Sequence, residues 1–112
     1  MGMETAGNLD QAFALITGTF SANGSSAQAK VAGRVNVNVT YTAGTGTVTL
    51  ERSFDGGATW SSFLRDKGGN IAAWTAAAPG NLVVDVGDER NTLIRLTLTA
   101  AAAATIVFRI SQ

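Results

Sequence analysis

The chain contains 112 residues, with eight basic and eight acidic side chains and neither cysteine nor histidine. The lack of cysteine excludes disulfides, thiolate catalysis and cysteine-ligated zinc, and the lack of histidine removes the commonest general base near neutral pH. Because the formal net charge is zero, the chain offers no strong positive field for phosphate groups, and we expect no nucleic acid among its partners.

The N-terminal segment MGMETAGNLDQ is small and polar. We expect residues 1–11 to form an arm that becomes ordered only against a neighbouring molecule, because chain ends are poorly ordered unless something ties them down. The candidate partner contacts in this arm are Met1, Gly2, Met3, Glu4 and Leu9. The chain shows no basic leader followed by an apolar run and no stretch long enough to span a bilayer, so neither a signal peptide nor a membrane partner is expected.

Residues 12–112 are expected to form a single all-β domain, because most segments alternate apolar and polar side chains between glycine-rich turns. The clearest strand is 34–42, RVNVNVTYT, whose alternate residues face a core on one side and water or a partner on the other. The core-facing residues are Val35, Val37, Val39 and Tyr41, and the outward residues are Arg34, Asn36, Asn38 and Thr40.

A β-hairpin is predicted after this strand. The turn is 43–46, AGTG, whose glycines tolerate positive φ, and the returning strand is 47–54, TVTLERSF. In this phase Phe54 faces the core and Ser53 faces outward.

The other predicted strands are 13–20, 26–31, 60–65, 71–74, 82–86, 92–99 and 105–110. The alanine run 100–104 is too short to nucleate a helix, so we expect it to be the hairpin connection between the last two strands. About eight strands at this spacing predict an antiparallel β-sandwich, and a jelly roll is one arrangement that fits.

The stretch SFDGGATW is the most distinctive motif, and we predict a structural turn built by Ser53, Asp55, Gly57, Thr59 and Trp60. An aspartate at a turn accepts backbone N–H bonds from two or three residues on, and glycines adopt positive φ. We expect the Thr59 hydroxyl to bond back to the turn and the Trp60 ring to lie over the corner. A calcium loop would need several carboxylates close in sequence, and only Asp55 is local. No metal ligand, cofactor site or catalytic residue is predicted here.

The spacing S-x-D-x-G-x-T-W resembles the Asp-box of sialidases and of many other β proteins. In sialidases this turn is a fold element remote from catalysis, and it is repeated around a propeller. The present chain has one copy and too few residues for a propeller. The resemblance therefore implies a structural corner and carries no glycosidase activity with it.

Other chemical groups do not form a recognisable enzyme site. Asp85, Asp88 and Glu89 cluster in a predicted solvent-exposed turn, and no histidine is present to activate a serine. No enzyme activity is therefore expected. For Trp74 and Tyr41 the favoured interpretation is burial in the core, and the alternative is an exposed aromatic contact for a carbohydrate, with Trp74 the candidate partner contact.

The segment GTVTLERSFDGGATW and the closing strand RISQ together resemble small β-sandwich proteins of tailed-phage virions, over about residues 30–112. The resemblance implies a non-enzymatic capsid cement or decoration protein located in a virion that assembles in the host cytoplasm. Its expected partners are the major capsid protein or other virion proteins. The low charge content is typical of self-association, with a trimer as one state. A head–tail connector, a tail component, or a carbohydrate-binding module on a fibre or cell surface are the alternatives.

Overall fold

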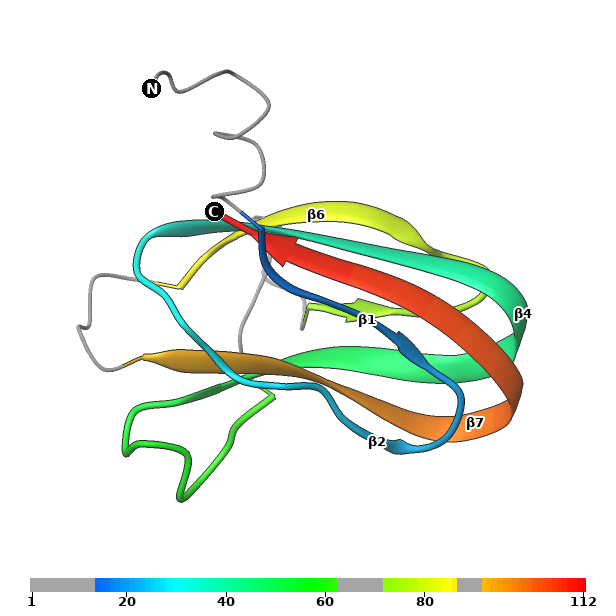
Figure 1. Ribbon diagram of the computed structural model, residues 1–112, viewed down its shortest axis with the longest axis horizontal. Helices are drawn as coiled ribbons and strands as arrows, with labels where there is room; N and C mark the ends of the chain where they lie inside the picture. The colour runs from blue at the N-terminus through cyan, green and yellow to red at the C-terminus, as the bar shows by residue number, and fades with distance from the viewer. Residues whose placement is uncertain (1–13, 63–71, 87–91) are drawn as a thin grey trace, which may run out of the picture.

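The computed structural model describes residues 14–62, 72–86 and 92–112, which form one antiparallel sheet of seven strands (Figure 1). The strands are β1 (Ala14–Phe20), β2 (Gly24–Ser25), β3 (Ala29–Lys30), β4 (Arg34–Ser53), β5 (Ala73–Trp74), β6 (Gly80–Asp85) and β7 (Leu93–Ser111). The predicted all-β, antiparallel fold is confirmed. No helix among the described residues is long and apolar enough to cross a bilayer.

The predicted arm, 1–11, lies outside the described residues, and so do its candidate contacts. These contacts are Met1, Gly2, Met3, Glu4 and Leu9. The second half of the predicted strand 60–65 also lies outside them, and in the described half Ser61 forms an isolated bridge with Arg52.

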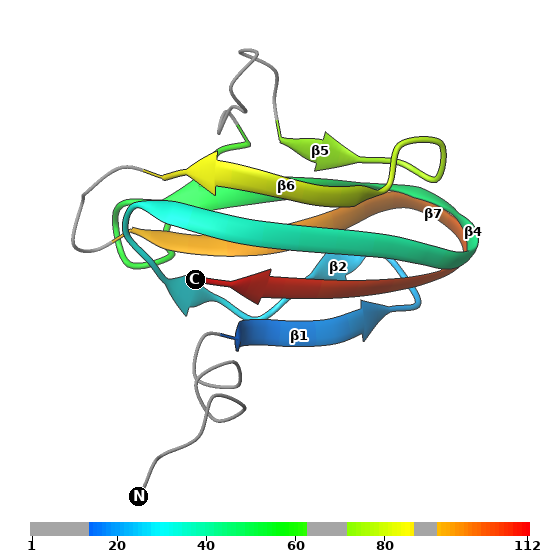
Figure 2. The ribbon, with the colours of Figure 1, turned by 90° about the horizontal axis from the view of Figure 1, so that it is seen from above.

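The long strands β4 and β7 pair with each other along almost their whole length, from Asn36 opposite Ser111 to Ser53 opposite Leu93. Both strands bend near their middle, so that the two halves of the sheet face one another (Figures 1 and 2). Register shifts in β4 mark the bend between Tyr41 and Thr47. One antiparallel ladder therefore runs through both halves of the fold.

The predicted hairpin turns at 43–46 and 100–104 are both wrong. Each segment lies inside a continuous strand, and Thr45 is paired with Ala102 across the bend. Glycine and small residues permit a bulge as readily as a turn, and bulges bend a strand without reversing it. The partner strand continues across the bend, so the chain keeps its direction.

Each half of the sheet is completed by short strands. In the first half, β6 pairs with β4 and β1 pairs with β7; in the second half, β5 pairs with β4 while β2 and β3 pair with β7. Of the predicted strand 26–31 only β3 is a strand, and β2 precedes the predicted range. A sandwich of two separate sheets is not confirmed, because the hydrogen-bonded sheet is continuous.

Apolar side chains from both halves form one core cluster. Val35, Val37 and Val39 of β4 are fully buried, as the alternation predicted. The second half contributes a matching set from β4 and β7: Val48, Leu50, Ile94, Leu96 and Leu98. Burial of such side chains is worth about 1.5–3 kcal/mol each, so facing apolar rows hold the bent sheet closed.

The burial of the residues at the end of β4 differs from the prediction. Phe54, predicted inward, is 45% exposed, whereas Ser53, predicted outward, is 1% exposed. Strand geometry ends at Ser53, so alternation no longer orients the residue after it. Ser53 stays on the outer side of the strand with Glu51, and it is buried because the turn that follows covers it and is hydrogen-bonded to its hydroxyl.

The bend places two alanines in backbone conformations that favour glycine. Ala100 and Ala103 have φ values of 56° and 50°. In this left-handed region the Cβ crowds the following carbonyl, at a cost of about 1–2 kcal/mol per residue. Across the ladder, Gly44 has a φ of 72°, and a Cβ there would collide with the carbonyl oxygen of Ala103.

We predict that Ala103→Gly stabilises the protein by about 0.5–1 kcal/mol, because relief of the left-handed strain exceeds the added flexibility of the unfolded chain. Denaturant unfolding measures the change. Ala102→Gly is the matched control, since Ala102 does not have positive φ and lies in the same run; it should destabilise. Equal effects of the two substitutions would contradict the strain at Ala103.

Candidate functional site

The SFDGGATW corner follows β4 directly and is closed by hydrogen bonds among its own residues. The Ser53 hydroxyl donates to Asp55 Oδ1 at 2.6 Å and accepts from the Gly57 backbone N–H at 3.0 Å. Thr59 donates to Asp55 twice, from its backbone N–H at 2.9 Å and from its hydroxyl at 2.5 Å. The predicted Thr59 hydroxyl bond is confirmed, but the backbone bond to Asp55 comes from four residues on and not from two or three, because the Gly57 N–H donates to Ser53. Both carboxylate oxygens of Asp55 are occupied.

Trp60 attaches this corner to the outer side of the second half of the sheet. Its indole N–H donates to the Gly57 carbonyl at 3.0 Å, so the ring lies over the corner as predicted. The Arg95 guanidinium lies 4.2 Å from the centre of the indole ring. Arg95 in turn pairs with Glu51 at 2.8 Å, and Glu51 also accepts from Thr97 at 2.6 Å.

The electrostatics of the corner favour an ionised Asp55. Hydrogen bonds from Ser53 and Thr59 hold the pKa of the Asp55 carboxyl well below its usual range. A carboxylate that stays charged at neutral pH cannot donate a proton as a general acid. Among the described residues, no group of three or more acidic side chains is placed to hold a metal ion.

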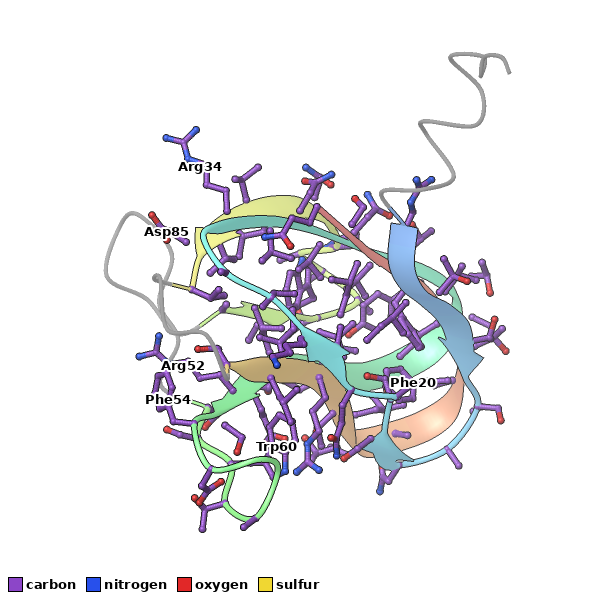
Figure 3. The ribbon with its side chains drawn as sticks, turned by 60° about the vertical axis from the view of Figure 1, so that its left-hand side comes forward. Phe20, Arg34, Arg52, Phe54, Trp60 and Asp85 are labelled. Carbon is purple, nitrogen blue, oxygen red and sulfur yellow. The ribbon has the colours of Figure 1, made fainter. Side chains whose placement is uncertain are left out.

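An exposed aromatic side chain lies beside the corner. The Arg52 guanidinium lies 4.9 Å from the centre of the Phe54 ring, and the two side chains lie together in Figure 3. Burial lowers the pKa of Arg52. Shallow hollows flank Phe54 on two sides, one of them lined by Lys30 and Leu93.

The predicted exposed contact at Trp74 is wrong. Trp74 is 3% exposed and belongs to the core cluster, because β5 turns its side chain inward against the facing half of the sheet. Tyr41 is half-buried, and its hydroxyl lies 2.8 Å from the Gly46 carbonyl and 3.0 Å from the Trp74 carbonyl. Burial raises the pKa of Tyr41. The two aromatics support the bend and do not form a platform.

Of the three acidic residues that the sequence placed in one turn, the structure describes one, Asp85. Asp85 is exposed at the end of β6 and lies opposite Arg34 in the register (Figure 3). Asp88 and Glu89 lie outside the described residues.

Two surfaces were not located by sequence reasoning. The first, the bend surface, is a hollow of about 410 Å³ lined by Thr45, Gly46, Thr47, Thr75, Ala76, Ala77 and Ala100. The second, the amide hollow, has a volume of about 500 Å³ and is lined by Asn36, Asn38, Asn81, Arg109 and Ser111. Alternation in 34–42 predicted that its asparagines face outward, but strand pairing was needed to bring them beside Asn81 and Arg109.

The chain matches no model of a known protein family, no curated protein and no solved structure. The resemblance to phage virion proteins therefore stays a prediction.

We predict that Asp55→Asn lowers Tm by several degrees at neutral pH, because the amide nitrogen that replaces one carboxylate oxygen cannot accept the hydroxyl bond made there, and the negative charge is lost. The folded-state pKa of Asp55 is depressed, so its stabilisation is full above the ordinary value of 3.8 and declines as the pH falls further. The difference in Tm between the two proteins should narrow below that pH. Thermal unfolding across a pH series measures it.

Thr59→Val removes one hydroxyl donor and should reproduce part of this effect. A Tm difference between wild type and Asp55→Asn that stays constant from neutral to strongly acidic pH would contradict the charged role of Asp55.

Proposed function

We propose that this chain is a non-enzymatic structural protein of a tailed-phage virion, in the first place a capsid cement or decoration protein that binds the assembled shell. The proposal rests on the resemblance of its central strand and corner to such proteins. The observation that supports it best is the bend surface, where small uncharged side chains line a shallow hollow. Side chains of this kind allow a partner to approach the backbone closely.

The SFDGGATW corner supports the same proposal. Its polar groups are used within the turn, and Trp60 fixes the turn to the sheet through Arg95. A corner of this kind keeps its shape without a ligand. The protein would then act by its surface, and affinity would come from buried area summed over several copies on a symmetric shell.

The proposed partners are the major capsid protein or other virion proteins, and the proposed location is the virion. Residues 1–11 remain the candidate arm for contact with the shell or with a neighbouring copy, and a homo-oligomer such as a trimer fits a local three-fold axis. A head–tail connector or tail component is the alternative within the virion. The carbohydrate module that would use Trp74 loses its support, because Trp74 is buried.

We predict that labelled protein appears on the heads of purified virions whose genome encodes this chain, as seen by immunogold electron microscopy.

The double variant Ala76→Lys/Ala77→Lys adds charge to an exposed turn on the bend surface and should weaken shell binding about tenfold or more, because an unpaired charge is costly to bury. Ala58→Lys, at an exposed position in the corner, is the control and should bind as wild type.

The location of the label separates the alternatives. Label on the neck or tail would favour the connector or tail component over the decoration protein. Absence of label from every particle, with a monomer at high concentration by analytical ultracentrifugation, would overturn the virion proposal.

A further inference from the structure

The amide hollow lies on the outer face of the first half of the sheet and is built by three neighbouring strands. In the register, Asn38 of β4 lies between Asn81 of β6 and Arg109 of β7. One row along, Asn36 lies between Val83 and Ser111. The lining side chains therefore project to one side of the sheet, around a volume of about 500 Å³. Pockets for small ligands have volumes of roughly 300–1,000 Å³.

The asparagines run against local preference. Asparagine is depleted in strands, and β-branched residues fit the same positions better. Neighbouring outward positions do carry such residues, for example Thr40 and Val107. A group of asparagines inside strands breaks a local rule, and such exceptions are expected at functional sites.

The hydrogen bonds within the hollow use only some of the donors and acceptors of the asparagine side chains. The Asn81 amide nitrogen donates to Asn36 Oδ1 at 2.7 Å, and the Thr40 hydroxyl donates to Asn38 Oδ1 at 3.2 Å. Among the described residues, the amide nitrogens of Asn36 and Asn38 and the guanidinium of Arg109 donate to no protein group. The hollow thus presents an excess of hydrogen-bond donors around one positive charge.

A carboxylate is the acceptor that this arrangement fits. The planar guanidinium pairs with a carboxylate through two parallel N–H···O bonds, and amide nitrogens bind further oxygens. On this face the Asp85 carboxylate lies opposite Arg34, four residues along β6 from Asn81. Among the described residues Arg109 forms no ion pair.

The distribution of polarity favours a sugar over a protein side chain. Protein interfaces have an apolar centre and a polar rim. Here the centre is polar, and the exposed apolar side chains, Val83 at 44% and Val107 at 43%, lie at its borders. A ligand rich in hydroxyl groups matches a hollow of amides and one serine hydroxyl.

We propose that the amide hollow binds a carboxylate-bearing saccharide, a hexuronic acid unit of an acidic polysaccharide. Arg109 holds the carboxylate, and Asn36, Asn38 and Asn81 bind sugar hydroxyls and ring oxygens. This proposal is independent of the proposed attachment through the bend surface. The result of its test does not depend on which partner the bend surface binds.

The test is a titration of the full chain with a trisaccharide of galacturonic acid, followed by backbone amide NMR and by calorimetry. Shifts are expected at the hollow-lining residues of β4, β6 and β7. Arg109→Gln should weaken the affinity by about tenfold or more, because it removes a charge-assisted bidentate pair. Arg34→Gln removes the same charge from the end of the same face and should leave the affinity within about twofold.

Asn38→Thr is a second variant that suits a strand, and it should weaken binding while unfolding at the wild-type temperature or above. The neutral galactose trisaccharide should bind at least about tenfold more weakly than the acidic one. The proposal is overturned by absence of shifts at roughly 10 mM acidic trisaccharide, by equal binding of both sugars, or by equal losses in Arg109→Gln and Arg34→Gln. Shifts with a triglutamate peptide and none with the sugar would overturn it in favour of a protein partner.

Discussion

The continuous pairing of β4 with β7 is the constraint on which the rest of the structure depends. Because one ladder passes through the bend, the two halves of the sheet are joined by hydrogen-bonded backbone as well as by their apolar faces. Opening the halves would require breaking the ladder at its bend or exposing both rows of core side chains. The other strands are short, with two to seven residues each, and add to edges that this pair already provides.

This arrangement distributes three surfaces over the molecule. The SFDGGATW corner follows the end of β4, and its tryptophan lies on the outer side of the second half. The bend lies away from it along the ladder and carries small side chains. The outer face of the first half carries the amide hollow. The polar side chains of the corner are hydrogen-bonded to one another or to its backbone, whereas those of the hollow are only partly used, so the hollow is the better place for a ligand.

The corner could be predicted from the sequence to a greater extent than the hollow. Every bond of the corner joins residues within a few positions of one another, so the turn at Asp55, its bond from the Thr59 hydroxyl and the placement of Trp60 could be predicted, although the backbone donor to Asp55 is one position further on than expected. The hollow joins Asn38 to Asn81 and Arg109, which are distant in sequence, and strand register cannot be derived from a single alternating pattern. Trp74 and Phe54 were misplaced for a related reason, since burial near strand ends depends on which element packs there.

The sequence by itself determined that this is an antiparallel all-β protein, that 34–42, 47–53, 93–99 and 105–110 are strand, and which side of 34–42 faces inward. Side-chain alternation is a local property with a period of two, so it can be read without knowing the partner strand. Only the tertiary structure decided that 43–46 and 100–104 bend the chain and do not reverse it. A segment of glycine and alanine permits either outcome, and the choice depends on whether a paired strand continues across it, as β4 and β7 do for each other.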